Sequence, residues 1–510
     1  MDFIAVILLL AVYYIRPQEW VGAFATLRPA MVTLAFAIIT MFLRERGFSF
    51  KSLFRTPHDW LIFAFFGWVI FTAESSMDAW SRTKVLFISY LVIVQAVHNM
   101  RRLNLLLMWW MGFLTFIALM AIASEYGIDP LGSGYLTHEV NKGRLSLNLS
   151  LFENPNALGH SVVPLLLMFY FYFVWKRPLF IKEIGIFLMM IPAYCLYLTQ
   201  SKGAFLSGFT STVIGFTFGR PKFVQVIILA MALTVGWTGL QLLPRMEQIK
   251  TMHADEGIIV RLQAWKVGFN TMQTLHPKGS GIDTFSSVFQ RIYGYPKAPH
   301  SSYVQVGTEL GYGGLLLFVG IIYCCFRTLL KVRTEDENEE RVRRVLLVML
   351  ISFCVSSWMI GWGLNLTFYV IAGTIAAFQR LMDEKVEKQI ADFKEAIKAG
   401  LEMQEQFGIE FAPSPAQQSL NQFPQQLPQP QFQPMLPAVS AAAAANGVVQ
   451  ISTPPDLIIK NPQTPPEIEE QIENQIKKKI LRRPRILDII LIWGLTYLVI
   501  WFWQYVMKKF

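Results

Sequence analysis

Long apolar runs separated by short basic or polar stretches fill the first 380 residues of the chain. Most of these runs approach or reach the roughly 20 residues that a helix needs to cross a bilayer. They lack the two-residue alternation of strands, and lipid cannot satisfy the open edges of a sheet. The pattern predicts an all-α polytopic membrane protein with about 12 transmembrane helices, an extra C-terminal membrane helix and one large loop outside the membrane.

The apolar runs lie at residues 3–15, 29–43, 59–73, 81–97, 103–123, 157–174, 184–199, 203–218, 223–242, 311–326, 345–360, 365–380 and 486–506. The first two runs are short, and Arg16-Pro17-Gln18-Glu19 stands between them. They predict either two tilted spans or a re-entrant pair, and both choices leave the later spans in the same orientation.

Basic residues gather in every second loop, which predicts the orientation. They are Arg44, Arg46, Lys51, Arg55, Arg101, Arg102, Lys176, Arg177, Lys182, Arg220, Lys222, Arg327, Lys331, Arg333, Arg341, Arg343 and Arg344. Loops rich in Lys and Arg stay on the cytoplasmic side. The loops at 74–80, 124–156, 200–202, 244–310 and 361–364 then face outward.

Composition changes after residue 380, so the chain divides into a membrane part and a tail. The predicted parts are transmembrane helices 1–9 at 1–243, an outward catalytic loop at 244–310, transmembrane helices 10–12 at 311–380, a cytoplasmic amphipathic helix at 381–411, a Pro/Gln-rich disordered linker at 412–466, a basic amphipathic helix at 467–485 and a C-terminal membrane helix at 486–510. The tail at 381–485 could recruit a cytoplasmic partner.

The net charge of +10 resides largely in the short loops, so it indicates membrane orientation rather than nucleic-acid binding. All four cysteines fall in apolar runs, which favours buried thiols over a disulfide framework. We expect no cleavable signal peptide, because no basic segment precedes the first run. The sequence has no metal-ligand spacing, Walker loop or dinucleotide-binding glycine pattern, so no metal and no cofactor are expected.

The longest polar interval between the first twelve spans, 244–310, carries the candidate chemistry. His300 follows Pro299 before a span, and a neutral imidazole suits a general base. Outward cations suggest a site for an anionic group: Arg82, Lys84, Arg144, Lys202, Arg261 and Lys266. The alternative is that each cation snorkels to lipid headgroups or pairs with Glu125, Glu153 or Glu309.

Three polar residues complete the predicted substrate site: Glu309, Asn154 and Asn156. Asn154-Pro155-Asn156 would also serve as a helix cap and turn without any substrate. Gly279, Gly281 and Gly311 could likewise serve only as turns.

Several ordered motifs over residues 1–380 resemble the O-antigen ligase/polymerase superfamily of bacterial envelope glycosyltransferases. They are Arg144 with Phe152-Glu153-Asn154-Pro155-Asn156, Thr199-Gln200-Ser201-Lys202-Gly203-Ala204, Arg261-Leu262-Gln263-Ala264-Trp265, Pro277 with Gly279-Ser280-Gly281 and Phe285, and Pro299-His300-Ser301-Ser302-Tyr303 with Glu309-Leu310-Gly311. The opening Tyr14-Ile15-Arg16-Pro17-Gln18-Glu19-Trp20 looks more like the branch of O-glycosylation ligases associated with exosortase systems.

The resemblance implies metal-independent glycosyl transfer at the periplasmic face of the bacterial inner membrane, with undecaprenyl pyrophosphate carrying the donor glycan. His300 matches the family's loop histidine and would act as general base in an inverting reaction, and Arg261 matches its loop arginine. The chain departs from the family pattern twice, with Lys202 in place of an arginine and Ser301 in place of the usual asparagine. Lys202 keeps the charge but loses the bidentate fork.

The acceptor stays open between lipid A–core in lipopolysaccharide biosynthesis, a growing glycan or other polysaccharide, and a protein hydroxyl. A ligase is favoured, and a polymerase or a protein O-oligosaccharyltransferase would use the same donor chemistry. A transporter or flippase for an anionic lipid-linked glycan would also need outward cations, but the sequence has no internal repeat typical of transporters. Membrane lipids are expected partners and nucleic acid is not.

Overall fold

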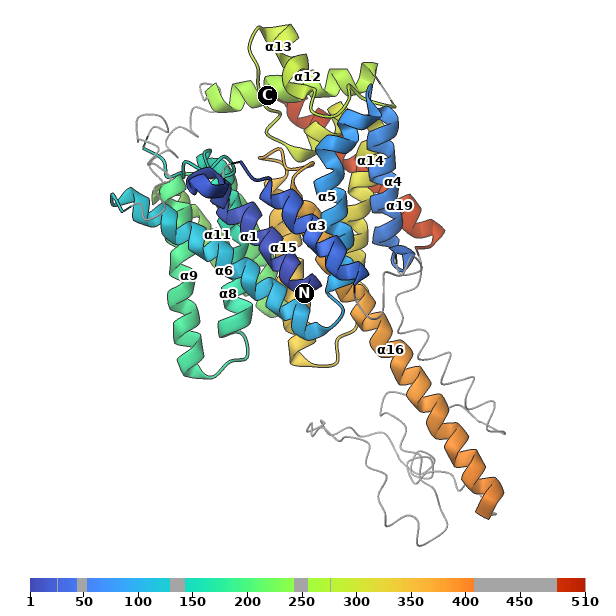
Figure 1. Cartoon of the computed structure of the whole chain (residues 1–510). Helices are drawn as coiled ribbons and strands as arrows, with labels where there is room; N and C mark the ends of the chain where they lie inside the picture. The colour runs from blue at the N-terminus through green and yellow to red at the C-terminus, as the bar shows by residue number, and fades with distance from the viewer. Residues whose placement is uncertain are drawn as a thin grey trace. The chain divides into compact units, whose positions relative to one another are not determined.

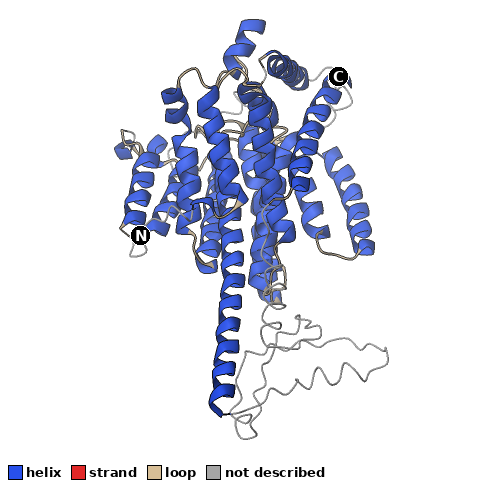
Figure 2. Cartoon of the chain, turned by 90° about the vertical axis from the view of Figure 1, so that its right-hand side faces the viewer, coloured by secondary structure: helices blue, strands red, loops and turns tan. Residues whose placement is uncertain are grey.

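The computed structural model describes residues 1–24, 26–43, 53–128, 143–242, 256–275, 277–407 and 484–509. All regular elements in these segments are helices, so the all-α class is confirmed (Figures 1 and 2). The elements are α1 (Asp2–Ile15), α2 (Pro17–Trp20), η1 (Gly22–Phe24), α3 (Pro29–Phe42), α4 (Pro57–Thr72), α5 (Ser76–Ala96), α6 (Met100–Glu125), α8 (Pro155–Phe169), η3 (Tyr170–Val174), α9 (Leu179–Thr199), α10 (Lys202–Thr217), α11 (Lys222–Leu242), α12 (Glu256–Thr274), α13 (Phe285–Tyr293), α14 (Ser302–Lys331), α15 (Glu337–Ser356), α16 (Leu366–Phe407) and α19 (Ile486–Lys509).

Every predicted apolar run forms a helix, and the largest difference at a helix start is at α14, which begins nine residues before the run predicted at 311–326. Five helices are long and apolar enough to cross a membrane by length and composition: Met100–Glu125, Pro155–Val174, Leu179–Thr199, Ser302–Lys331 and Ile486–Lys509. Asp2–Ile15, Pro29–Phe42 and Lys222–Thr234 are shorter apolar helices. The count of about twelve spans therefore remains a prediction.

The chain divides into two compact units. The first holds Met1–Leu381 together with Arg483–Phe510, and its helices form a bundle. The second holds Met382–Arg482, of which only the continuation of α16 to Phe407 is described. The predicted linker at 412–466 and nearly all of the basic helix predicted at 467–485 lie outside the described residues.

Loops predicted to share a side meet at the same end of the bundle. Lys176 Nζ lies 2.9 Å from Glu337 Oε1, and Arg344 Nη1 donates to the Phe218 carbonyl at 3.0 Å. At the opposite end, Ser201 Oγ donates to Asn156 Oδ1 at 2.8 Å and the Ser302 amide donates to the Ser357 carbonyl at 2.7 Å. We call this second end the site end.

The two ends of α1 contact loops that the sequence places on opposite sides. Asp2 Oδ1 accepts from Arg102 Nη1 at 3.1 Å, whereas Tyr13 Oη donates to Asn365 Oδ1 at 2.6 Å. A helix that crosses the whole bundle makes such contacts, which favours the tilted span over the re-entrant alternative.

Helix α12 lies crosswise over the site end of the bundle, with α13 above it (Figure 1). It packs closely on the first part of α14, because Gly268 has no side chain: a Cβ there would lie only 2.7 Å from Val304 Cγ1. The region predicted as a loop at 244–310 thus contains two helices and the start of a third.

Helix α14 is broken at Gly311, whose φ of 66° and ψ of −164° are not helical. The carbonyls beside the break find new donors: the Ser280 amide donates to Thr308 at 2.9 Å, the Gly281 amide to Glu309 at 2.9 Å and Trp68 Nε1 to Leu310 at 2.9 Å. Buried carbonyls need such partners. The break therefore docks the turn at 277–281 onto α14 and fixes the chain that leads to α13.

Candidate active site

The turn between α9 and α10 presents Lys202 at the site end. Gln200 ends α9 in the left-handed conformation, at φ 48°, and Ser201 caps α10 by accepting from the Ala204 amide at 3.3 Å. Lys202 is the first residue of α10 and is half-buried. The helix dipole adds positive potential at this position, so an anion would meet both the ammonium group and the helix N-terminus.

A polar scaffold holds this turn against α8. Arg144 donates to the Thr199 carbonyl at 3.0 Å and to Asn156 Oδ1 at 2.8 Å, and the same Oδ1 accepts from Ser201. Asn154 caps α8 by accepting from the Asn156 amide at 2.8 Å. The cap expected at Asn154 is present. Arg144 and Asn156 hold Thr199 and Ser201, which precede Lys202.

His300 ends the connection that leads into α14. Its backbone has φ 49°, a conformation that is uncommon for a residue with a side chain and is often found at functional sites. The next residue, Ser301, caps α14 by accepting from the Val304 amide at 3.4 Å. Serine and asparagine are both strong N-caps, so the departure at Ser301 preserves the cap.

The start of α14 is anchored to the segment that follows α15. Besides the bond from its amide to Ser357, Ser302 Oγ donates to the Ile360 carbonyl at 2.9 Å and accepts from the Trp362 amide at 2.8 Å. Met359 lies within this anchored segment, so its position relative to His300 is fixed by backbone contacts.

Met359 joins the three candidate elements. The guanidinium Nη1 of Arg261, on α12, lies 4.0 Å from Met359 Sδ. On the other side, a Cβ on Gly203 would lie 3.0 Å from Met359 Cβ and Cγ. The fold thus brings Arg261, the Lys202–Gly203 turn and the His300 segment together from three distant stretches of sequence.

The electrostatics of this cluster act on His300. Burial, together with the positive charges of Arg261 and Lys297, lowers the pKa of His300 to about 4. The imidazole is therefore neutral at physiological pH and can accept a proton. Positive charge nearby also marks a place where an anion would be stabilised.

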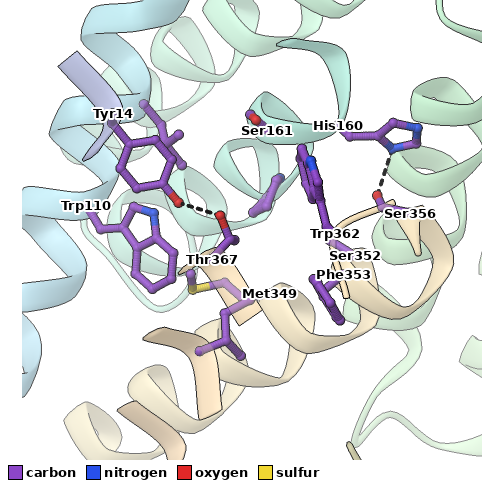
Figure 3. A pocket seen from close by; sticks show the side chains of 13 residues that line it. Tyr14, Trp110, His160, Ser161, Met349, Ser352, Phe353, Ser356, Trp362 and Thr367 are labelled. Carbon is purple, nitrogen blue, oxygen red and sulfur yellow. Dashed lines mark hydrogen bonds between the residues drawn. The ribbon is translucent and has the colours of Figure 1, made fainter. Parts of the chain in front are cut away.

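A second histidine lies beneath the cluster. His160 Nδ1 is 2.7 Å from Ser356 Oγ, and its Nε2 faces Gly203, where a Cβ would lie 3.2 Å away. His160 also lines a small cavity of about 30 Å³, and the hydroxyls of Tyr14 and Thr367, which line the same cavity, form a hydrogen bond of 3.3 Å (Figure 3). Glycine at 203 lets this buried ring pack under the start of α10.

Residues 184–319 match the model of a family described as O-antigen ligase. This match supports membership of the O-antigen ligase superfamily. The match contains Lys202, Arg261 and His300, whereas α8 and α19 lie outside it. No curated protein matches the chain.

Three other cations of the predicted site lie on different surfaces. Arg82 pairs with Asp283, in the turn before α13, and both side chains are exposed. Lys84 comes two residues later on α5, about 200° around the helix from Arg82. Lys266 is exposed on α12, about 140° around the helix from Arg261. The pairing interpretation therefore applies to Arg82, although with a different partner from the three glutamates considered.

Glu309 is a buried structural residue in this arrangement. Its side chain is 2% exposed, and Oε1 accepts from the amide of Phe285, the first residue of α13, at 3.3 Å. A carboxylate at a helix N-terminus satisfies a free amide and interacts favourably with the dipole. Glu309 thus helps to hold the start of α13, and its substrate role stays a prediction.

The opening Arg-Pro-Gln-Glu motif clamps the segment before α8. Glu19 accepts from the Ser150 amide at 2.8 Å and from Ser150 Oγ at 2.7 Å, and it pairs with Arg16. Burial raises the pKa of Glu19, but these hydrogen bonds outweigh it and the pKa is lowered overall. The motif therefore holds the segment that leads to Asn154 and Asn156 through its contact with Ser150.

The hydropathy pattern does not indicate the contacts through Met359 and His160. Methionine in an apolar run reads as core, and His160 is one of seven histidines. Its place four residues after Asn156 was the available signal, because that spacing puts it one helical turn inside α8.

Proposed function

We propose that the protein transfers a glycan from a polyprenyl pyrophosphate, undecaprenyl pyrophosphate in a bacterial inner membrane, to an acceptor hydroxyl at the periplasmic face. The observation that carries this proposal is the convergence of Arg261, the Lys202–Gly203 turn and the His300 segment at one end of the helical bundle. Two cations and a neutral base in one place suit the departure of an anion and the activation of a hydroxyl.

The reaction needs one bond to form and one to break. The acceptor oxygen attacks the anomeric carbon on the face opposite the pyrophosphate, and the bond from that carbon to the pyrophosphate oxygen breaks. Configuration at the anomeric carbon inverts. The electron pair leaves with the lipid pyrophosphate, and His300 takes the hydroxyl proton.

Arg261 and Lys202 would stabilise the charge that develops on the leaving pyrophosphate. Fixed charges at the position where charge develops contribute strongly to catalysis, because they need no reorganisation. Lys202 acts as a point charge with the helix N-terminus behind it, and Arg261 offers a planar fork for the phosphate oxygens.

The low pKa of His300 in the free protein fits the role of base once a donor binds. Arg261 and Lys297 help to lower that pKa, and a bound pyrophosphate would offset their positive charge. The pKa would then rise towards neutrality in the complex, where a base is most effective.

The acceptor distinguishes the related activities. A ligase would use lipid A–core, a polymerase would use a growing glycan, and a protein O-oligosaccharyltransferase would use a Ser or Thr hydroxyl. The neutral base at His300 favours all three over a flippase, since transport of the lipid-linked glycan needs no proton acceptor.

Purified full-length protein, incubated with a lipid-linked glycan and EDTA, tests the proposal. Lipid A–core, free donor glycan and a Ser/Thr peptide are offered separately, and product is measured by mass. We expect product on one acceptor with wild type and about 100-fold or more less with His300→Ala.

The same assay distinguishes a glycosyltransferase from a flippase. Product that requires an added divalent metal would contradict metal independence, and product that survives His300→Ala would remove His300 as the base. Donor binding without product on any acceptor would favour the flippase.

A further inference from the structure

The C-terminal helix α19 lies outside the family match, yet it packs along the full length of α14. Near the start of α19, Asp488 Oδ1 accepts from Tyr323 Oη at 2.5 Å and from Arg327 Nε at 3.2 Å. Near its end, Trp503 reaches Gly307, where a Cβ would lie 3.1 Å from the Trp503 ring. Both ends of α19 are therefore fixed, and the helix runs antiparallel to α14 from the basic end to the site end.

Trp503 connects α19 to the helix that carries Arg261. The side chain is fully buried, in contrast to its neighbours on α19, most of which are exposed. Its Nε1 donates to the Trp265 carbonyl at 3.0 Å, and its ring packs edge-on against Phe269 at 5.4 Å between centroids. Trp265 is four residues after Arg261, so the contact is one helical turn from the guanidinium.

Helix α19 also touches the segment that carries Met359. The ring centroid of Phe502 lies 4.8 Å from that of Trp358. The Trp358 centroid lies 5.6 Å from that of Trp265 and 4.6 Å from that of Tyr303. These aromatic rings join α12, α14, α19 and the segment after α15 directly beside Arg261 and Met359. Loss of a fully buried indole contact at this point would free α12 to shift relative to Met359.

We propose that Trp503 is a positioning residue for the transfer reaction, which holds α12 through the Trp265 carbonyl so that Arg261 stays beside Met359. This role rests on the proposed function. Through this contact α19 contributes to the active site, although the tail at 381–485 separates it in sequence from the other helices. Trp503 touches no reacting atom in this proposal and acts through Arg261.

The test uses full-length protein with Trp503→Phe, which keeps a ring in the buried site and removes the N–H donor. Trp501→Phe is the matched control, because Trp501 lies on the same helix and is 47% exposed. We expect Trp503→Phe to lower kcat about fivefold, the loss typical of one hydrogen bond, with donor KM changed less than about twofold. Trp501→Phe should equal wild type.

A double-mutant cycle identifies the route of the effect. In an Arg261→Lys background, the guanidinium that Trp503 positions is gone, so adding Trp503→Phe should lower kcat by less than about twofold more. Equal losses in both backgrounds, or wild-type kcat for Trp503→Phe, would overturn the proposal.

Hydrogen exchange provides a readout that does not depend on turnover. Amides of α12 should exchange faster in Trp503→Phe than in wild type and Trp501→Phe, and unchanged exchange would contradict the docking role. If Trp503→Phe does not fold, strong protection of α12 amides in wild type is required, and rapid exchange there would overturn the proposal. Absence of transfer by wild type would instead refute the proposed function.

Discussion

His300 combines three features that rarely occur in one surface histidine. Its backbone is left-handed, its side chain is half-buried, and two cations lower its pKa together with burial. Such a residue is held in place by its surroundings, here by the cap at Ser301 and the anchored start of α14. An imidazole fixed in this way offers its lone pair in one direction, which a general base requires.

The pH dependence of activity should reflect this pKa. Because the pKa of free His300 is lowered to about 4, the neutral base persists as pH falls, and kcat/KM should stay near its plateau down to about pH 5. The acid limb of kcat should lie at higher pH, since bound pyrophosphate raises the pKa in the complex. Steady-state kinetics from pH 4 to 8 measure both limbs. Coincident limbs at the ordinary histidine value of about 6.5 would contradict the electrostatic account.

At the residue scale, the family resemblance predicts Lys202, Arg261 and His300 as site residues, and the structure shows which contacts hold the segments that carry them. Arg261, Lys202 and His300 were identifiable because their motifs match the family, whereas Asp283 as partner of Arg82 was not. The two residues are about 200 positions apart in sequence, and which long-range pairs form depends on how the helices pack. Charge on an outward surface does not distinguish a substrate site from such an ion pair.

The break in α14 shows how one backbone position organises an element. Gly311 adopts φ 66°, which other residues disfavour, and a Cβ there would collide with the Pro277 carbonyl. The matching glycine is Gly279, at φ 77°, where a Cβ would lie 2.5 Å from the Gly311 amide nitrogen. The two glycines thus let the backbone at 277–281 lie directly against the backbone of α14. The sequence predicts turns at these glycines but not this contact.

Gly311→Ala should destabilise the protein by at least about 2 kcal/mol, from the left-handed backbone together with the collision. Gly112→Ala is the matched control, because Gly112 lies in a regular helix with open space where a Cβ would stand. Thermal unfolding in detergent, followed by fluorescence-detected size exclusion, measures both. Equal melting temperatures for the two variants would refute this role of Gly311.

Apolar runs predicted which segments are helices, but they could not predict α12 and α13. Both helices lie at the site end, where polar residues such as Lys266 and Asn270 face outward and no long apolar run forms. The same reason explains the early start of α14: Ser302 and Thr308 are polar yet buried, because their hydroxyls donate hydrogen bonds to backbone carbonyls. Hydropathy detects lipid contact, and buried polar helices escape it.

Across the described part of the bundle, several loops that the charge pattern assigns to opposite sides lie at opposite ends. Arg327, Arg344 and Lys176 lie at one end, and Lys202 and His300 lie at the other. The contacts of α19 place the C-terminal end of this helix at the site end. Sequence could identify this last apolar run but not its position, since a long tail separates it from its neighbours.

Thiol labelling of intact cells tests this arrangement. A membrane-impermeant maleimide should label Glu153→Cys and Lys508→Cys, which are exposed at the site end, but should label Lys222→Cys only after lysis. Wild type is the background control, because its four cysteines are free and at least half-buried. Labelling of Lys222→Cys alone would reverse the orientation, and joint labelling of Lys508→Cys with Lys222→Cys would show that α19 does not cross.

The central claim is that His300 acts in the chemical step, whereas Lys202 and Arg261 act on the pyrophosphate. Donor binding and single-turnover transfer, measured on the same purified protein, test it directly. His300→Ala should bind donor within about threefold of wild type and transfer about 100-fold or more slowly. Lys202→Gln should lose both binding and rate, and Lys222→Gln, at the first position of α11 away from the site, should match wild type. Wild-type single-turnover rates in His300→Ala would contradict the account.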